Sequence, residues 1–301
     1  MSKILVAKFS LIIVAMSWGA TFLPIQKMLK YINVPSFLFF RFLIAGSLLL
    51  IFALKFRAKF DKNSIKFGAI LGIFMFFDFI FQTYALNYTF SSTVAFIIGL
   101  NVVIVPFLLF KTFLNLNSIL SAIFAFFGLF LLSGAKGFSI GFGEFLSLIS
   151  AFAYAFHVIF TGKFAKKTDI LPLLISQFFT MSLFCFIYAL FFAEPTNGAF
   201  NLIGGFEIWL SLNFVYIIIF TSFFATVVAF FVQTKAQIYL NPTQTSLILT
   251  LEPVAAGFIG YFIGGENLNL TQILGSVLII FAILMSELNL IKFIRKFTRK
   301  I

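Results

Sequence analysis

The chain has 301 residues and a net charge of +12, with 62% hydrophobic residues and only 10% charged residues. Soluble domains carry about a quarter charged residues, so this composition excludes a soluble enzyme, a disordered chain, a collagen-like chain and a disulfide scaffold. It predicts a protein that crosses a membrane several times. Hydrophobic runs such as 42–54 are unbroken, whereas a β-barrel would show alternating segments of about 10 residues. We therefore expect helices.

A transmembrane helix needs about 20 mostly apolar residues. The sequence contains ten such segments, in chain order residues 6–26, 35–54, 66–87, 92–112, 117–135, 143–163, 170–192, 210–233, 242–263 and 270–290. The first segment resembles a signal peptide, with Lys3 and Lys8 at its start. Because nine more segments follow, we interpret it as a retained helix. The predicted fold class is all-α, a polytopic membrane protein with ten transmembrane helices.

The basic residues indicate how these helices are oriented. Of the 21 Lys and Arg residues, Arg41 lies within a span, and 17 fall on the cytoplasmic side if the N-terminus is cytoplasmic. The three on the outside are Lys27, Lys30 and Lys136. Positive loops stay in the cytoplasm, so the bias predicts cytoplasmic N- and C-termini. We expect a multi-pass protein of a bacterial cytoplasmic (inner) membrane. The positive charge reflects topology, and we expect no nucleic-acid partner.

The sequence also contains an internal repeat. Residues 82–85 match residues 233–236 at an offset of 151, and the same offset pairs Phe79 with Phe230 and Leu100 with Leu251. Earlier spans align at an offset of 136, which pairs Trp18 with Tyr154. The repeat unit therefore has five helices, with residues 1–138 as the first unit and 139–301 as the second. Because five is odd, the second copy enters the membrane from the opposite side, and such inverted repeats are typical of secondary transporters.

Several motifs of the second repeat together resemble those of a known family. They are Gln233-Thr234-Lys235-Ala236-Gln237, Asn241-Pro242-Thr243, Leu251-Glu252-Pro253, Gly264-Gly265-Glu266 and Gly275. The first repeat has Leu100-Asn101 and Asn115 in place of the acidic motifs. The chain resembles the drug/metabolite transporter superfamily, in its ten-helix branch with two EamA-type repeats. This resemblance implies export of small metabolites, often amino acids or related compounds, by alternating access.

Polar residues at bilayer depth are costly and should face the bundle interior. We predict a central polar cavity lined by spans 1, 3, 4, 6, 8 and 9, with interhelical hydrogen bonds as the alternative. The predicted substrate-binding residues are Trp18, Gln82, Asn101, Tyr154, His157, Gln233 and Glu252. His157 has the alternative role of a hydrogen-bonding wall residue.

Three ionisable residues are candidates for proton coupling or ion pairing. Arg41 and Asp78 lie at similar depths in the outer half, and they could form either a static ion pair or one that substrate or protons break. Glu252 lies near the midplane beside Pro253, which bends a helix. We predict that Glu252 carries protons, with a packing role as the alternative.

The predicted function is a secondary active transporter that moves a small organic metabolite outward by alternating access. An amino acid or related compound is favoured as the substrate. The alternatives are a passive channel or facilitator, and less favoured an intramembrane enzyme. The sequence has one histidine and no nucleotide motif, so we expect no metal, no cofactor and no enzymatic activity. The expected partners are a small-molecule substrate and the lipid bilayer, with proton coupling as one energy source. The solute and the oligomeric state are left open.

Overall fold

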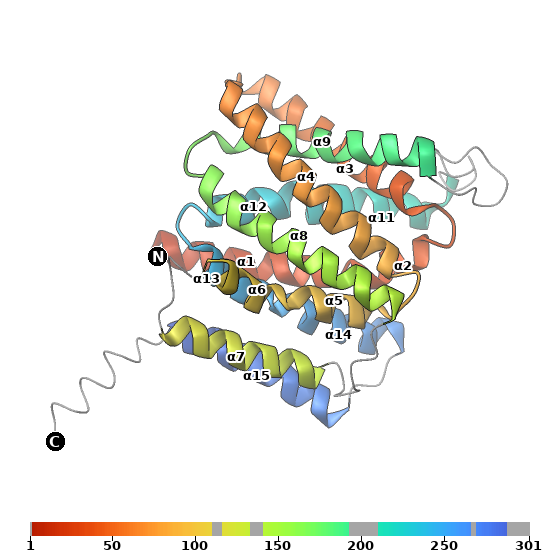
Figure 1. The fold of residues 1–301 in the computed structure, drawn as a ribbon. Coiled ribbons are helices and arrows are strands. Elements are labelled where there is room, and N and C mark those ends of the chain that lie inside the picture. The colour runs from red at the N-terminus through yellow and green to blue at the C-terminus, as the bar shows by residue number, and fades with distance from the viewer. Residues whose placement is uncertain (1, 110–115, 133–140, 193–209, 266–268, 288–301) are drawn as a thin grey trace.

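The structure is a computed structural model that describes residues 2–109, 116–132, 141–192, 210–265 and 269–287. The described residues form a bundle of helices that lie side by side, and each helix runs along the line that joins the two ends of the bundle (Figure 1). The helices are α1 (Lys3–Gly19), α2 (Phe22–Met28), α3 (Val34–Lys55), α4 (Lys62–Ala85), α5 (Ser91–Gly99), α6 (Asn101–Leu108), α7 (Leu116–Leu132), α8 (Phe142–Phe164), α9 (Ile170–Phe192), α11 (Leu212–Ser222), η1 (Phe223–Val228), α12 (Ala229–Ala236), α13 (Pro242–Leu249), α14 (Leu251–Gly264) and α15 (Leu270–Glu287).

Each of the ten predicted spans coincides with one helix or with consecutive helices. Within the described residues, eight helical segments are long and apolar enough to cross a membrane, and two shorter apolar helices, at 119–131 and 270–285, complete the set. The prediction of an all-α membrane protein with ten helices is confirmed. The predicted motif residues Asn115 and Glu266 lie outside the described residues, as do Lys111, Lys136 and the basic residues of 288–301.

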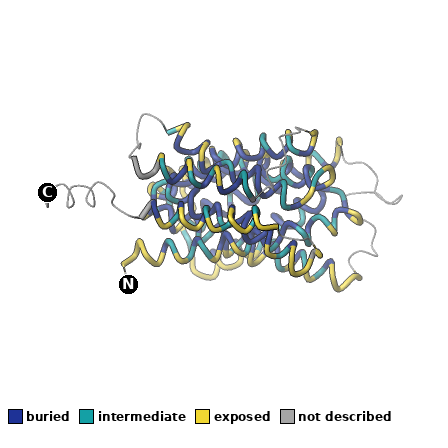
Figure 2. The backbone as a smooth tube through the Cα atoms, turned by 90° about the horizontal axis from the view of Figure 1, so that it is seen from below, coloured by how far each residue is buried: buried dark blue, intermediate teal, exposed yellow. Residues whose placement is uncertain are grey.

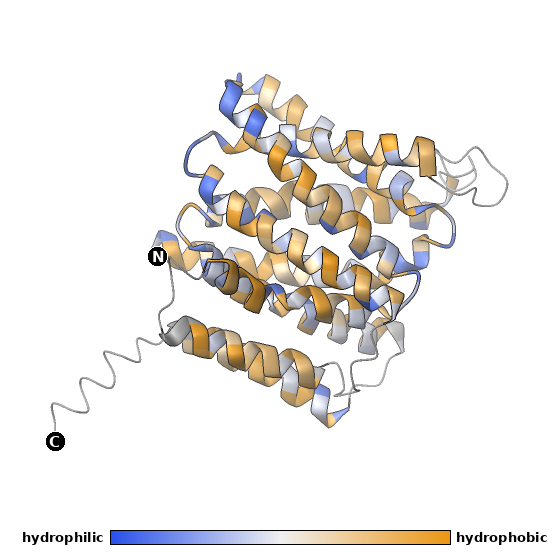
Figure 3. Ribbon diagram, viewed as in Figure 1, coloured by the Kyte–Doolittle hydropathy of each residue, from blue (hydrophilic) through white to orange (hydrophobic). Residues whose placement is uncertain are grey.

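The surface of the bundle matches a lipid environment. Apolar residues cover the length of the helices, and hydrophilic residues gather at the helix ends and connections (Figure 3). Exposed positions lie on the outer faces of the helices, and buried positions lie inside the bundle (Figure 2). Lipid-facing apolar side chains need no protein partner, because lipid tails are as apolar as they are.

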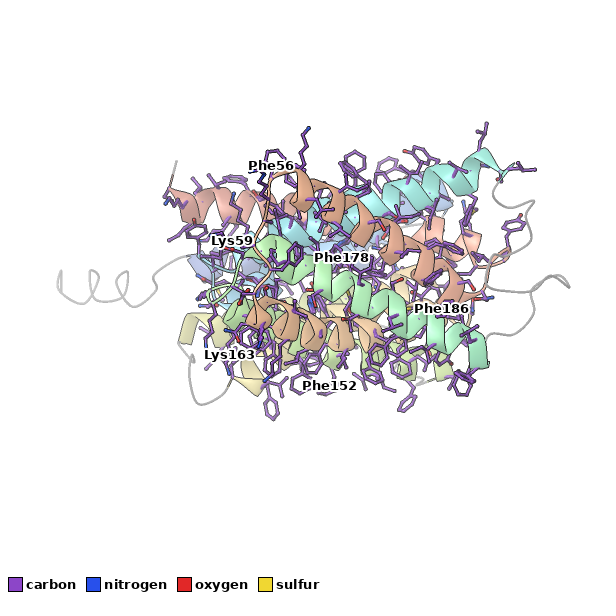
Figure 4. The ribbon with its side chains drawn as sticks, turned by 90° about the horizontal axis from the view of Figure 1, so that it is seen from above. Phe56, Lys59, Phe152, Lys163, Phe178 and Phe186 are labelled. Carbon is purple, nitrogen blue, oxygen red and sulfur yellow. The ribbon has the colours of Figure 1, made fainter. Side chains whose placement is uncertain are left out.

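One end of the bundle carries lysines on several helices. Lys55 ends α3, Lys62 begins α4, and Lys163 and Lys235 lie in the last turns of α8 and α12. Figure 4 places Lys59 of the α3–α4 connection at the same end as Lys163. We call this the basic end. The start of α1 also lies there (Figure 1).

Local sequence signals explain several helix starts. Asn33 caps α3 by accepting a hydrogen bond from the Ser36 N–H, at 2.9 Å. Asn241 caps α13 by accepting one from the Gln244 N–H at 2.8 Å, and Pro242 occupies the first turn. A proline is tolerated there because the first N–H groups of a helix have no partner within it. Asn241 and Pro242, which belong to a motif of the second repeat named above, therefore form the start of α13.

Among the described helices, four spans are interrupted inside the bundle. The breaks separate α1 from α2, α5 from α6, and α13 from α14, while η1 is a π-helical turn between α11 and α12. Leu100 lies at the α5–α6 break and Thr250 at the α13–α14 break. Because Leu100 and Leu251 are paired by the repeat, these two breaks fall within one residue of corresponding positions. Paired interruptions of this kind are typical of the binding region of transporters with inverted repeats.

Close packing of α4 on α9 gives a testable prediction. A Cβ atom at Gly72 would lie 2.6 Å from Thr180 Cβ and 2.7 Å from the Gln177 carbonyl oxygen. Gly72→Ala should therefore destabilise the fold by about 1–3 kcal/mol through overpacking, measured as the midpoint of thermal unfolding in detergent. Gly46→Ala is the matched control, since its nearest neighbour is the Phe179 ring at 3.4 Å. Equal midpoints for the two variants would contradict the prediction.

Candidate functional site

A cavity lies inside the bundle, where spans of both repeats meet. Its volume is about 30 Å³, which is room for one or two water molecules. The lining residues are Trp18, Thr21, Phe22, Ile25, Arg41, Asp78, Phe79, Gln82, Thr83, Leu86, Ile98, Tyr154, Phe230 and Glu252. The structure thus brings together six of the nine predicted site residues. All six spans that we expected around a cavity contribute to it, and span 2 adds Arg41.

Residues related by the repeat meet at this cavity. Trp18 of α1 packs edge-on against Tyr154 of α8, with 6.2 Å between ring centroids. Phe79 of α4 packs against Phe230 of α12 at 6.1 Å. Each pair joins one residue of the first copy to its counterpart in the second. The cavity therefore lies at the contact between the two copies, as expected for inverted repeats.

The π-helical turn η1 supplies a backbone acceptor next to the cavity. Because a π-helix shifts the backbone hydrogen bonds by one residue, side chains of other helices reach the Ala225 carbonyl oxygen. The Trp18 indole N–H donates to this oxygen at 2.8 Å, and an Arg41 guanidinium N–H donates to it at 3.3 Å. The turn therefore connects α1 and α3 of the first copy to span 8 of the second.

Arg41 is held mainly by η1 and by aromatic rings. Its Nε–H donates to Thr226 Oγ1 at 2.8 Å, and the guanidinium lies 5.0 Å from the Phe79 ring centroid. Such cation–π contacts favour a desolvated guanidinium. The Arg41 side chain is 2% exposed.

Asp78 has a different partner. Its carboxylate accepts a hydrogen bond from the Ser150 hydroxyl of α8 at 2.6 Å. Within the described residues, Arg41 and Asp78 form no direct salt bridge, although both side chains line the cavity. The direct contact that we expected is therefore replaced by bonds to Thr226, Ala225 and Ser150, and any ion pairing during transport stays a prediction.

Glu252 lies directly after the break in span 9. It is buried in the first turn of α14, where the helix N-terminus favours negative charge. Its side chain lines the cavity together with Asp78 and Tyr154. The span is interrupted at Thr250, before Glu252, and Pro253 belongs to the first turn of α14. The acid therefore sits at the edge of the cavity beside a helix break, as the neighbouring proline indicated.

The other three predicted residues are buried near the cavity but do not line it. His157 lies 3.0 Å from Gln177 through its Nε2 atom. Asn101 donates to the Ile98 carbonyl oxygen at 2.8 Å, and its own Oδ1 has no partner. Gln233 is fully buried, and neither of its side-chain polar atoms has a hydrogen-bond partner. Substrate binding by any of the nine residues stays a prediction.

A hydrogen-bond network lies next to the cavity, on the side away from the basic end. Gln26 of α2 donates to the carbonyl oxygens of Leu86 and Thr89, at 2.9 and 3.1 Å. The Thr89 hydroxyl in turn donates to Glu144 of α8 at 2.6 Å. Leu86 also lines the cavity. The network therefore ties α2, the α4–α5 connection and α8 together on that side of the site.

Comparisons with known proteins agree with this architecture. The EamA-like transporter family matches residues 5–134 and again residues 141–288. An uncharacterised transporter of Archaeoglobus fulgidus is 29% identical over 290 residues, which cover 95% of this chain and 87% of the relative. A solved crystal structure shares the fold with a TM-score of 0.72 and 13% identity, over 93% of this chain and 95% of its own. The chain belongs to the EamA-like transporter family, within the drug/metabolite transporter superfamily.

Proposed function

We propose that this protein is a secondary active transporter that exports a small organic metabolite by alternating access around the central cavity. The observation that carries the proposal is a cavity lined by a buried guanidinium and two buried carboxyl groups, at the contact between the copies. Charged groups inside a membrane protein are costly and usually mark a substrate or ion pathway. The cavity admits only one or two waters in this state, so binding a metabolite requires the surrounding helices to move.

The cavity chemistry favours a solute with both an acidic and a basic group. Arg41 has five N–H donors, and the structure assigns two of them to the protein, so others are available for a solute carboxylate. Asp78 and Glu252 suit an ammonium group. Trp18 and Tyr154 add an aromatic wall. This combination supports an amino acid or a related compound as the substrate.

The energy source for transport is inferred from the lack of a nucleotide-binding motif in the sequence. No nucleotide-binding motif is present in the sequence, so the solute's own gradient or coupled protons would drive transport. The activity is transport without chemical change of the solute.

Counterflow in proteoliposomes tests the proposal directly. Vesicles loaded with unlabelled solute should transiently accumulate labelled solute, because an alternating-access carrier exchanges one molecule for another. Candidate amino acids and related zwitterions are supplied one at a time, with empty liposomes as the control. Solute flux without counterflow would indicate a channel, and chemical alteration of the solute would indicate an intramembrane enzyme.

The proposed orientation gives a separate prediction. A reporter fused after residue 301 should be active in the cytoplasm, because the basic end carries most of the described loop lysines. A matched fusion within the α2–α3 connection, near Lys30, should report the opposite side. If the reporter at the C-terminus is active outside the cytoplasm, the C-terminus does not lie on the cytoplasmic side of a bacterial inner membrane. That result would contradict the proposed orientation.

A further inference from the structure

Phe230 occupies a central position among four helices. Its ring lines the cavity and contacts Trp18 of α1 at 5.1 Å and Phe178 of α9 at 5.8 Å between centroids. It also meets His157 of α8 edge-on at 5.8 Å. Figure 4 shows Phe178 within the bundle, between the basic end and Phe186. With the Phe79 contact described above, Phe230 forms the part of the cavity wall from which α12 continues towards the basic end.

Beyond Phe230, the same face of α12 becomes polar. Gln233 and Gln237 follow at i+3 and i+7, so they lie on the face that carries Phe230. Both are fully buried. Gln237 donates to the Val158 carbonyl oxygen of α8 at 2.8 Å, and Thr161 follows one turn later on α8. We call Thr161, Gln233 and Gln237 the polar seam. At 1.5 Å per residue, the seam covers about 6 Å along the helix axis of span 8 and ends about 10 Å from Phe230.

The polar seam contains hydrogen-bonding atoms without partners. These are both polar atoms of Gln233, Oε1 of Gln237 and Oγ1 of Thr161. Buried polar groups in native proteins nearly always have a partner, from protein or from ordered water. Apolar side chains would pack this region without that penalty, so the amides and the hydroxyl are suited to bind water or a solute between the helices.

We propose that Phe230 is the barrier between the central cavity and a second polar station, the polar seam, which the solute occupies on its way between the cavity and the basic end. This inference rests on the proposed transport function and deepens it. The three seam residues carry no charge. The polar station therefore binds the uncharged hydrogen-bonding groups of the solute, and water molecules that move with it. The charged groups of the cavity hold the ionic groups of the solute on the other side of Phe230.

Thiol labelling from each side of the membrane tests the barrier. Cys185 is the only cysteine and is buried, so Cys185→Ala provides a background for single-cysteine variants. In that background, a membrane-impermeant thiol reagent added at the basic end should label Gln233→Cys. It should not label Thr234→Cys, which is buried to a similar degree on the adjacent face of α12. Lys59→Cys marks access from the basic end.

The second arm removes the barrier. Reagent added at the opposite end should label Gln233→Cys only when Phe230→Ala is also present. Phe230→Leu should give an intermediate rate, and it keeps the test informative if the alanine variant does not fold. Phe230→Ala should also raise solute leak without counterflow by at least tenfold, because the cavity and the seam become continuous.

The outcomes separate this inference from the proposed function. Labelling of Gln233→Cys from both ends with Phe230 intact would overturn the barrier. Absence of labelling from the basic end, while Lys59→Cys reacts and counterflow is normal, would overturn the polar station and leave the transporter standing. Loss of counterflow in the unaltered protein would overturn the proposed function, whatever the labelling pattern.

Discussion

Arg41→Ala is expected to lower the midpoint of thermal unfolding in detergent more than any other single cavity substitution. The change leaves Thr226, the Ala225 carbonyl oxygen and the nearby carboxyl groups without the buried guanidinium. An uncompensated buried charge typically costs about 3–5 kcal/mol. Arg57→Ala is the matched control, because Arg57 is exposed and surface substitutions usually stay within about 0.5 kcal/mol.

A double variant separates the electrostatic part of this loss from the loss of packing. Adding Asp78→Ala to Arg41→Ala should restore part of the stability, because it removes a negative charge that Arg41 offsets across the cavity. Ser150 remains to solvate the site. Strictly additive damage would show that Arg41 and Asp78 do not interact, and that Arg41 acts through η1 and Phe79 alone.

Glu252→Gln is expected to keep the fold and abolish the pH dependence of transport. A neutral amide has the shape of the protonated acid, so packing around the α13–α14 break should be preserved. If Glu252 takes up and releases protons as access alternates, the wild-type initial rate changes with pH around neutrality and the rate of the variant does not. The measurement is initial uptake into proteoliposomes at several pH values, beside thermal unfolding in detergent.

Two controls make the Glu252 result specific. Asp169→Asn changes an exposed acid in the α8–α9 connection and should leave the pH profile intact. Asp78→Asn changes the other cavity acid and shows whether protons act there. An unaltered pH profile with normal rates in Glu252→Gln would remove the coupling role, and loss of folded protein would support the packing role.

Hydropathy predicted the spans well because the bilayer imposes a length on every helix. It could not predict where a span breaks. Residues 223–228 read Phe-Phe-Ala-Thr-Val-Val, an apolar run without glycine or proline, yet they form a π-helical turn. The turn is held by Trp18 and Arg41, which lie about 200 residues earlier in the chain. Its stabilisation is tertiary and therefore invisible to local patterns.

The sequence predicted how deep the charged residues of the candidate site lie in the membrane, but not which side chains they contact. Depth along a helix follows from counting residues, so Arg41 and Asp78 were predicted at similar depths in the outer half and Glu252 near the midplane. The partner of a charged side chain depends on helix rotation, which small packing contacts set. Ser150 had no sequence signal, because a serine in an apolar helix resembles any small packing residue. The internal repeat paired Phe230 with Phe79. Nothing in the sequence indicated that Phe230 contacts His157 and Phe178.

The π-helical turn also has a consequence for how this chain tolerates changes in length. A π-turn accommodates one residue more than the α-helical turn that it replaces, so span 8 holds a residue in excess of a regular helix. Deleting one residue within 223–228 should give a continuous α-helix and leave α11 and α12 in their places, whereas a deletion in α4 would rotate every later residue by about 100°. The two copies of the repeat therefore differ in the insertions and deletions that they accept, and single-residue length variation is expected to concentrate at η1.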